Sequence, residues 1–126
     1  MPTGTAPCSD KAEVNLPMAV LTTKNTASAA ELFAAALRDY GKGVLIGSTT
    51  YGKGVMQRTF GLHDGSSVKF TIAEFVPPSG VSFNGVGLAP DISVELTKEE
   101  SARFYYFTDE EDPHLNAALE YFGDLS

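Results

Sequence analysis

The alternation of apolar and polar positions predicts a strand, a helix and a second strand in the first half of the chain. Residues 18–23 form a compact apolar run, which fits a strand that is buried on both faces. From Ser28 onward apolar residues recur at three- and four-residue steps, which predicts a helix with one apolar stripe. The stripe consists of Ala29, Leu32, Phe33, Ala36, Leu37 and Tyr40. Residues 44–47 resume an apolar strand, so the whole unit has the length of a parallel βαβ crossover.

The second half of the pattern predicts a hairpin followed by short strands and two helices. Residues 55–62 and the alternating stretch 68–72 flank an Asp-Gly turn at 63–66, which predicts a hairpin with a half-buried return strand. The remaining predicted elements are two short strands and two helices, at residues 81–86, 91–96, 98–105 and 113–122. The acidic run 109–112 between these helices is typical of a solvated linker.

Composition limits the chain to one domain or part of one. It has 126 residues, 43% of them hydrophobic, and nine basic against 16 acidic residues give a formal net charge of -7. Without a cluster of basic residues the footprint of a nucleic-acid binder is missing, so we expect no nucleic-acid partner. The single cysteine, Cys8, has no neighbouring metal ligands, and no metal site is expected. Residues 1–15 lack periodicity and are interpreted as a loop or an added leader. No apolar run approaches the roughly 20 residues of a membrane span.

Ser28 has two interpretations. The sequence Ser28-Ala29-Ala30-Glu31 is an S-x-x-E capping box, in which the serine hydroxyl would accept a hydrogen bond from a helix N–H. Alternatively, the hydroxyl is a nucleophile at a strand-to-helix turn, where helix N–H groups can stabilise an oxyanion. Taken alone, the capping box is the commoner case, and both interpretations stay open at this point.

A nucleophilic serine needs a base, and the candidate base here is a lysine. His63 and His114 are interpreted as a turn residue and a helix-cap residue. Lys53 lies between Gly52 and Gly54, which permit unusual backbone angles and the close approach of another segment. The alternative for this Gly-Lys-Gly sequence is a tight turn with an exposed lysine.

A lysine base must be largely neutral at the working pH. Bringing its pKa from about 10.4 to about 7 requires roughly 4 to 5 kcal/mol of differential destabilisation, mainly by desolvation. The lysine therefore needs a dry pocket and an orienting partner without negative charge. Gln57 offers a neutral amide oxygen, but in a straight strand it would lie about 13 Å from Lys53. A bend between them is required, and Gly54 allows one.

Seven separate stretches carry a family resemblance. They are residues 25–41, Gly47, 50–57, 64–66, 77–80, 85–91 and 112–115. Occurring in this order, they resemble the carboxyl-terminal processing proteases, also called tail-specific proteases. The likeness covers almost everything after residue 15. Thr26 and Ala30 depart mildly from the family, whose members often have serine at these positions.

The resemblance implies site residues, an activity and a fold. Ser28 would be the nucleophile, Lys53 the general base and Gln57 the residue that orients the lysine, with the Ala29 N–H in the oxyanion hole. The serine-to-lysine interval of 25 residues is that of the family. Family members cleave near the C-termini of unstructured proteins with apolar tails, through an acyl-enzyme and without a cofactor. Their core is similar to the crotonase and Clp protease fold, so an α/β fold with βαβ layers around a mixed sheet is expected.

Full members of the family also contain parts that this sequence lacks. A PDZ domain and a Gly-rich loop precede the serine strand in them, and nothing here corresponds to either. Residues 16–126 are therefore interpreted as the C-terminal part of a protease core, which need not be active in isolation. The PDZ domain of a parent chain is an expected partner, and unpaired sheet edges would invite dimerisation. The resemblance also implies a location outside the cytoplasm, with membrane anchoring through a missing N-terminal segment.

Two alternative functions belong to other classes. The first is a non-catalytic module of the same fold that binds peptides or apolar ligands, and a solvated Lys53 far from Ser28 would favour it. The second is an acyl-transfer enzyme of the crotonase type, which is disfavoured because no CoA-binding stretch is recognisable.

Overall fold

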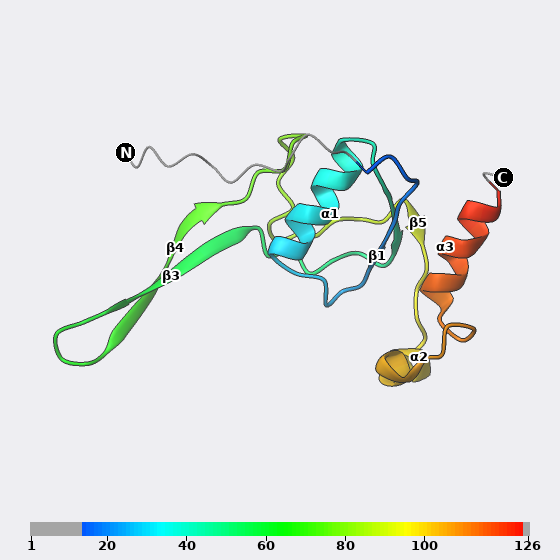
Figure 1. The fold of residues 1–126 in the computed structure, drawn as a ribbon. Helices are drawn as coiled ribbons and strands as arrows, with labels where there is room; N and C mark the ends of the chain where they lie inside the picture. Colours follow the sequence, from blue (N-terminus) through cyan, green and yellow to red (C-terminus); the bar gives the residue numbers. More distant parts are fainter. Residues whose placement is uncertain (1–13, 125–126) are drawn as a thin grey trace.

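The computed structural model describes residues 14–124, and its centre is a three-stranded parallel sheet (Figure 1). The predicted leader, except for residues 14 and 15, and Cys8 lie outside the described residues. The elements in chain order are β1 (Ala19–Thr22), α1 (Ala29–Asp39), β2 (Val44–Gly47), β3 (Val55–Gly61), β4 (Ser67–Glu74), β5 (Ile92–Ser93), α2 (Lys98–Arg103), the 3-10 helix η1 (Phe104–Tyr106) and α3 (Pro113–Gly123).

Parallel and antiparallel pairings occur in separate sheets. The parallel sheet has the strand order β1-β2-β5, and β3 pairs with β4 in an antiparallel hairpin. Helix α1 lies on one side of the parallel sheet and α3 on the other (Figure 1). The predicted α/β class is confirmed. None of the helices within residues 14–124 has the length and apolarity needed to cross a membrane.

The βαβ unit β1-α1-β2 is confirmed as predicted. Strands β1 and β2 run parallel in a register that pairs Val20 with Leu45. Helix α1 ends because Gly41 adopts φ 65°, a left-handed conformation that suits glycine. The backbone N–H of Gly41 donates to the Arg38 carbonyl at 2.9 Å, and that of Lys42 donates to the Leu37 carbonyl at 2.8 Å. These two bonds form a Schellman motif, which turns the chain directly into β2.

The core is divided between the two faces of β2. Leu45 and Ile46 are both fully buried, and as successive strand residues they point to opposite faces. The Leu45 face packs against α1, and α3 packs against β1 and β2 on the other face. The cluster around Leu45 contains Ala34, Ala35, Phe83 and Leu88.

The predicted apolar stripe of α1 is wrong for its largest members. Phe33 and Tyr40 are 65% and 69% exposed, whereas the buried residues of the helix are Glu31, Ala34 and Ala35. The two alanines and the partly buried Leu32 pack toward the core, whereas Phe33 and Tyr40 lie on the outer surface. Amphipathic periodicity alone did not distinguish these two apolar faces.

Two strands are less buried than predicted. Leu21 in β1 is 42% exposed, because β1 is an edge strand and α3 covers its face only in part. In the hairpin, Phe70 and Ile72 are exposed instead of half-buried. The hairpin projects from the body, and no described segment covers either of its faces (Figure 1).

The segment predicted as a strand at residues 81–86 is a loop. Its polar groups bind the loop at residues 50–54 around Lys53 instead of a neighbouring strand. Asn84 Oδ1 accepts the Gly54 N–H at 3.0 Å, and the Gly85 N–H donates to the Gly52 carbonyl at 2.8 Å. The strand predicted at 91–96 is confirmed only over Ile92–Ser93.

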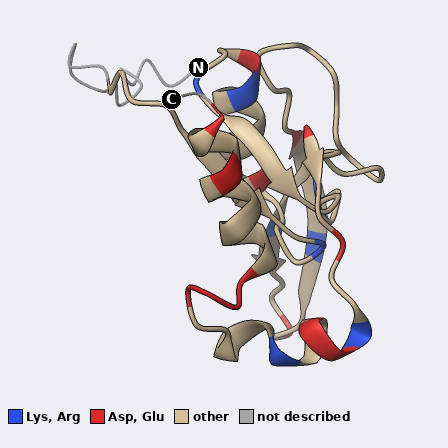
Figure 2. Ribbon diagram, turned by 90° about the vertical axis from the view of Figure 1, so that its right-hand side faces the viewer, with Lys and Arg blue, Asp and Glu red and all other residues tan. Residues whose placement is uncertain are grey.

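The two late helices are confirmed, with one change in the acidic run that joins them. The first continues into η1, and the second begins after Asp112, whose carboxylate accepts the His114 N–H at 2.9 Å and the Leu115 N–H at 3.3 Å. Asp112 is thus a helix cap, whereas residues 109–111 are exposed as a linker should be. Acidic residues, shown in red, lie on α2 and on this turn into α3 (Figure 2).

Replacement of Gly52 by alanine tests how tightly the loops at 50–54 and 83–88 interlock. Gly52 has φ 87°, and a Cβ there would lie 2.8 Å from the Gly87 nitrogen. Gly65 has φ 84° with nothing near its Cβ position, so Gly65→Ala is the matched control for backbone strain alone. We expect Gly65→Ala to lower the free energy of unfolding by about 1–2 kcal/mol, and Gly52→Ala to lower it by about 1–3 kcal/mol more.

Chemical denaturation of the two variants measures this difference. Equal losses at positions 52 and 65 would show that the opposing loop moves aside at little cost, and would contradict the interlocking.

Candidate active site

Ser28 has a strained backbone at the junction between β1 and α1. Among residues 14–124 it is the single non-glycine with positive φ, at φ 60° and ψ -120°. The Ala30 N–H donates to the Ala27 carbonyl at 3.3 Å, which closes a tight turn around it. These dihedral angles are those of the first central position of a type II′ turn, normally taken by glycine. Holding serine there costs on the order of 1–3 kcal/mol, and such strain clusters at functional sites.

The Ser28 hydroxyl is not consumed by the helix cap. The S-x-x-E capping box is formed and directs the Glu31 N–H toward the Ser28 side chain, but the hydroxyl makes no cap hydrogen bond of full geometry. The well-formed bond runs in the other direction, from the Ser28 N–H to Glu31 Oε2 at 2.8 Å. The half-buried hydroxyl thus remains available for chemistry.

A buried carboxylate connects the turn at residues 27–30 (the serine turn) to the loop at residues 50–54 that contains Lys53 (the lysine loop). Glu31 is 0% exposed. Its Oε1 accepts the Thr50 hydroxyl at 2.5 Å and the Gly52 N–H at 2.6 Å, and its Oε2 accepts the Lys53 N–H at 2.8 Å in addition to the Ser28 N–H. Sequence reasoning missed this residue, because the capping box accounted for it locally. The available signal was its place three and four residues before Ala34 and Ala35, on the face that packs against the sheet.

The hydrogen bonds keep Glu31 ionised. Burial by itself would raise the pKa of its carboxyl group. The Thr50 hydroxyl and the N–H groups of Gly52, Lys53 and Ser28 all stabilise the charged form, and together they lower the pKa below its ordinary value.

Lys53 is close to Ser28 through its backbone. The two backbone nitrogens lie 2.8 Å from the same Glu31 oxygen, so they can be no further apart than twice that distance. The Lys53 side chain is exposed, and within residues 14–124 its ammonium makes no hydrogen bond or ion pair. The structure therefore brings the two backbones together without a hydrogen bond between hydroxyl and ammonium.

Gln57 lies on β3, next to an irregularity in the hairpin. The register of β3 against β4 shifts between Met56 and Gln57, because β4 contains an extra residue there. Such bulges bend a strand and re-aim its side chains. The Gln57 side chain is exposed and makes no hydrogen bond to Lys53 in the described part of the chain.

Ala29, the predicted oxyanion-hole residue, directly follows Ser28 at the start of α1. Ala29 is the first residue of α1 and is exposed. Its N–H makes no hydrogen bond with other described residues, as is usual in the first turn of a helix. The neighbouring Ala30 N–H is already used in the serine turn. Of these two, Ala29 has the available donor.

Thr50 anchors the lysine loop to the rest of the fold. Its hydroxyl donates to Glu31 and accepts the Leu88 N–H at 2.7 Å, and its own N–H donates to the Leu88 carbonyl at 3.1 Å. The next N–H, of Tyr51, donates to the Thr26 carbonyl at 2.9 Å. The loop is therefore bound on one side to the segment before Ser28 and on the other to the core residue Leu88.

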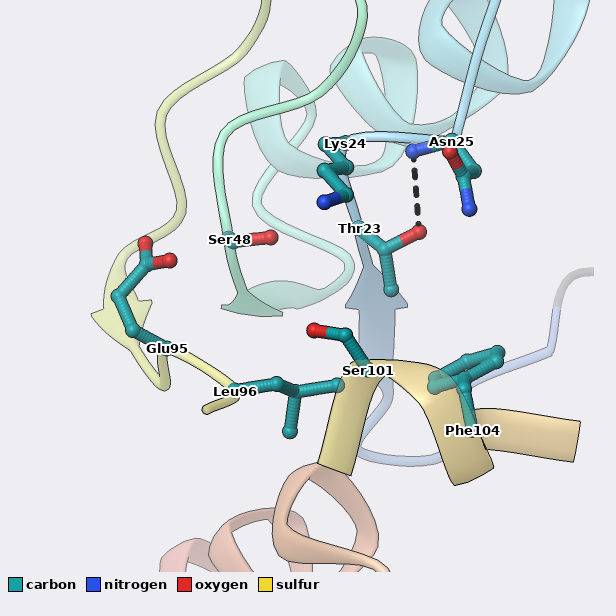
Figure 3. Close-up of a pocket in the computed structure, with 8 residues that line it drawn as sticks. All are labelled: Thr23, Lys24, Asn25, Ser48, Glu95, Leu96, Ser101 and Phe104. Atoms are coloured by element: carbon teal, nitrogen blue, oxygen red, sulfur yellow. Dashed lines mark hydrogen bonds between the residues drawn. The ribbon is translucent and has the colours of Figure 1, made fainter. Parts of the chain in front are cut away.

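Two hollows lie at the carboxyl ends of the parallel strands. The first, of about 90 Å³, is lined by residues that follow β1, β2 and β5 together with residues of α2 and η1 (Figure 3). These are Thr23, Lys24, Asn25, Ser48, Glu95, Leu96, Ser101 and Phe104. The second, of about 400 Å³, includes Ala27 and Ala30 on the two sides of Ser28, along with the apolar side chains of Leu21, Phe104 and Tyr105.

His63 occupies the hairpin turn as predicted, whereas the cap of α3 is Asp112 and not His114, which is the second residue of the helix. His114 is buried near the start of α3, where its Nε2 lies 3.0 Å from the Val94 carbonyl oxygen. Among the residues that the structure describes, no group of His, Cys, Asp and Glu is arranged to hold a metal ion.

An α/β domain that displays a strained serine at a strand-to-helix turn has an architecture typical of hydrolases. Residues 3–94 match the model of peptidase family S41, and the chain belongs to this family. A chloroplastic C-terminal processing peptidase of Tetradesmus obliquus is 42% identical over 79 residues, which are 63% of this chain and 17% of that protein. Carboxyl-terminal-processing peptidase 1 of Arabidopsis thaliana, also chloroplastic, is 45% identical over 78 residues, which are 62% of this chain and 16% of that protein.

A solved structure gives the same result. That of a photosystem II D1 C-terminal processing protease matches with a TM-score of 0.61 at 41% identity, over 64% of this chain and 21% of the other. The resemblance to the carboxyl-terminal processing proteases is confirmed. The chain spans about a sixth of the length of the curated relatives it matches.

The lowered pKa of Glu31 predicts how its contribution to stability depends on pH. Because its pKa is lower in the folded than in the unfolded state, the contribution is fully present above the ordinary pKa of 4.5. It is lost as the pH falls through the folded pKa. We therefore expect the difference in unfolding free energy between wild type and Glu31→Gln to be constant near neutral pH and to shrink below pH 4.5.

Denaturation at a series of pH values measures this difference. The contributions of the carboxyl groups that both proteins share to the free energy of unfolding largely cancel in it. A difference that stays unchanged from neutral pH to well below the ordinary pKa would contradict the prediction.

Proposed function

We propose that this chain provides the catalytic residues of a serine endopeptidase that cleaves protein substrates near their C-termini. The observation that supports this most is the strained Ser28, whose turn shares one buried carboxylate with the loop of Lys53. Family membership and the C-terminal processing peptidases among its relatives support the same reaction.

In the proposed reaction, neutral Lys53 takes the proton of the Ser28 hydroxyl as its oxygen attacks a carbonyl carbon near the substrate C-terminus. The Ala29 N–H helps to stabilise the oxyanion. The carbon–nitrogen bond then breaks, and the lysine returns the proton to the leaving amine. Water activated by Lys53 next releases the acyl group from Ser28, and Gln57 orients the lysine amine throughout. These reaction steps require no cofactor.

Lys53 must lose its contact with water for this reaction. Its side chain is exposed, so desolvation has to come from bound substrate or from groups beyond residues 14–124. We propose that residues 16–126 are the C-terminal part of a crotonase-like protease core in a longer protein. A PDZ domain and further core segments would supply substrate capture and the dry pocket. Dimerisation through sheet edges and an extracytoplasmic location with a membrane anchor are part of the same proposal.

The proposed substrate end is apolar. The hollow beside the serine turn has an apolar part formed by Leu21, Phe104 and Tyr105, and it reaches Ala27 and Ala30 on the two sides of Ser28. Its remaining lining residues are polar or charged, namely Thr23, Asn25, Thr26, Asp112 and His114. An apolar side chain placed there would release water from these groups. This geometry suits peptides with apolar C-terminal residues.

The exposure of Lys53 favours one alternative. A non-catalytic module of the same fold would bind peptides or apolar ligands in this hollow without using Ser28 or Lys53. Such a module would retain its affinity for an apolar-tailed peptide and show no turnover.

Substitution of the proposed dyad distinguishes these functions. In the full-length protein, we expect Lys53→Ala to lower kcat for an apolar-tailed peptide by about 10²–10⁴-fold, as expected for loss of a general base. Ser28→Ala should abolish acylation. Lys69→Ala on the projecting hairpin is the matched control and should cleave like wild type, since it removes an exposed lysine remote from the serine turn.

Steady-state cleavage and mass spectrometry of the acyl-enzyme give the readouts. Unchanged cleavage by Lys53→Ala would rule out the lysine as the base. Peptide binding without any turnover by the wild type would establish the non-catalytic module instead.

A further inference from the structure

We propose that Glu31 is a positioning residue of the active site, whose carboxylate holds the Ser28 turn and the Lys53 loop in one fixed relation. The proposal rests on the proposed function, because it concerns how the dyad is assembled. Glu31 would not touch substrate. It would act through the backbone of the two residues that do.

The contacts of Glu31 go beyond those of a helix cap. A second capping box in the same chain, Thr97 with Glu100, shows what capping alone requires: Glu100 Oε2 accepts the Thr97 N–H at 2.7 Å, and Thr97 Oγ1 accepts the Glu100 N–H at 3.2 Å. Both bonds stay within the cap. Glu31 makes the corresponding bond to Ser28 and three more to the loop at 50–53, which is about twenty residues away in sequence.

The chemistry of these four bonds requires a carboxylate. All four partners are donors, three backbone N–H groups and one hydroxyl, and an ionised carboxylate is an acceptor at both oxygens. A glutamine would direct an NH₂ group at two of the donors. An aspartate is shorter by one methylene group and could not span the same gap. Charge and side-chain length are therefore both used.

The bonds are placed where they control the reacting groups. One fixes the N–H of Ser28, whose φ of 60° would otherwise relax toward a more common conformation. Another fixes the N–H of Lys53, and the Gly52 and Thr50 bonds fix the residues that lead to it. A misplacement of about 1 Å at such a site can reduce the rate about 100-fold.

Glu31→Gln in the full-length protein tests the proposal, with Glu100→Gln as the matched control at the other capping box. We expect Glu31→Gln to reduce kcat about 100-fold and to leave KM nearly unchanged, because the substrate contacts stay in place. Hydrogen exchange should accelerate in both the segment 26–33 and the segment 48–55. Glu100→Gln should cleave like wild type and should change exchange at its own helix only.

A second variant guards against loss of folding in the first. Thr50→Val removes one of the four donors, and with it the acceptor of the Leu88 N–H, while nearly preserving shape. We expect a smaller loss of kcat, about tenfold. All rates are measured well below the unfolding temperature of each variant, so that a merely structural role would leave the rate of Ser28 acylation unchanged.

The outcomes separate this proposal from the proposed function. Acylation of Glu31→Gln at the wild-type rate, with Ser28→Ala inactive, would overturn the role of Glu31 and leave the protease function intact. An inactive wild type would overturn the protease function, and hydrogen exchange would then decide the claim about Glu31. Faster exchange in both segments would support it, and faster exchange confined to 26–33 would overturn it.

Discussion

The structure depends on one buried charge. The Glu31 carboxylate is out of contact with solvent, which is tolerable only because four donors surround it. Those donors belong to the start of a helix and to a loop after the second strand, so neither segment can satisfy the carboxylate alone. The hydrogen bonds that stabilise the buried charge thus also fix the backbone of Ser28 relative to the backbone of Lys53.

This arrangement explains why glycines occur in the loop of Lys53 and in the segment that lies against it. To reach Glu31, the loop must run against the segment 84–88 with almost no space between the backbones. Gly52 and Gly87 meet this need, because a Cβ on either would lie within 3 Å of opposing backbone atoms. Thr50 then connects the loop to Leu88 in the core. The carboxylate, the glycines and the core are one continuous support for the serine turn.

The sequence predicted what local patterns determine. The βαβ unit, the hairpin and the late helices follow from periodicity and turn chemistry, which act over a few residues. Burial could not be predicted in the same way, since the exposure of Phe33 and Leu21 depends on which segments cover them. Glu31 was missed for a related reason: its local role as a cap is real, and its further bonds come from a loop about twenty residues away.

The two members of the proposed dyad are controlled to different extents. The Ser28 side chain is short, so a fixed and strained backbone fixes its hydroxyl closely. The Lys53 ammonium stands at the end of a long flexible stem, and the same backbone anchor leaves it free to move in solvent. In the proposed mechanism, the Glu31 contacts would therefore hold the nucleophile in place but only the backbone of the base. The environment that would make the lysine neutral has to be assembled around it, which would couple activity to the arrival of substrate or of the remaining protease core.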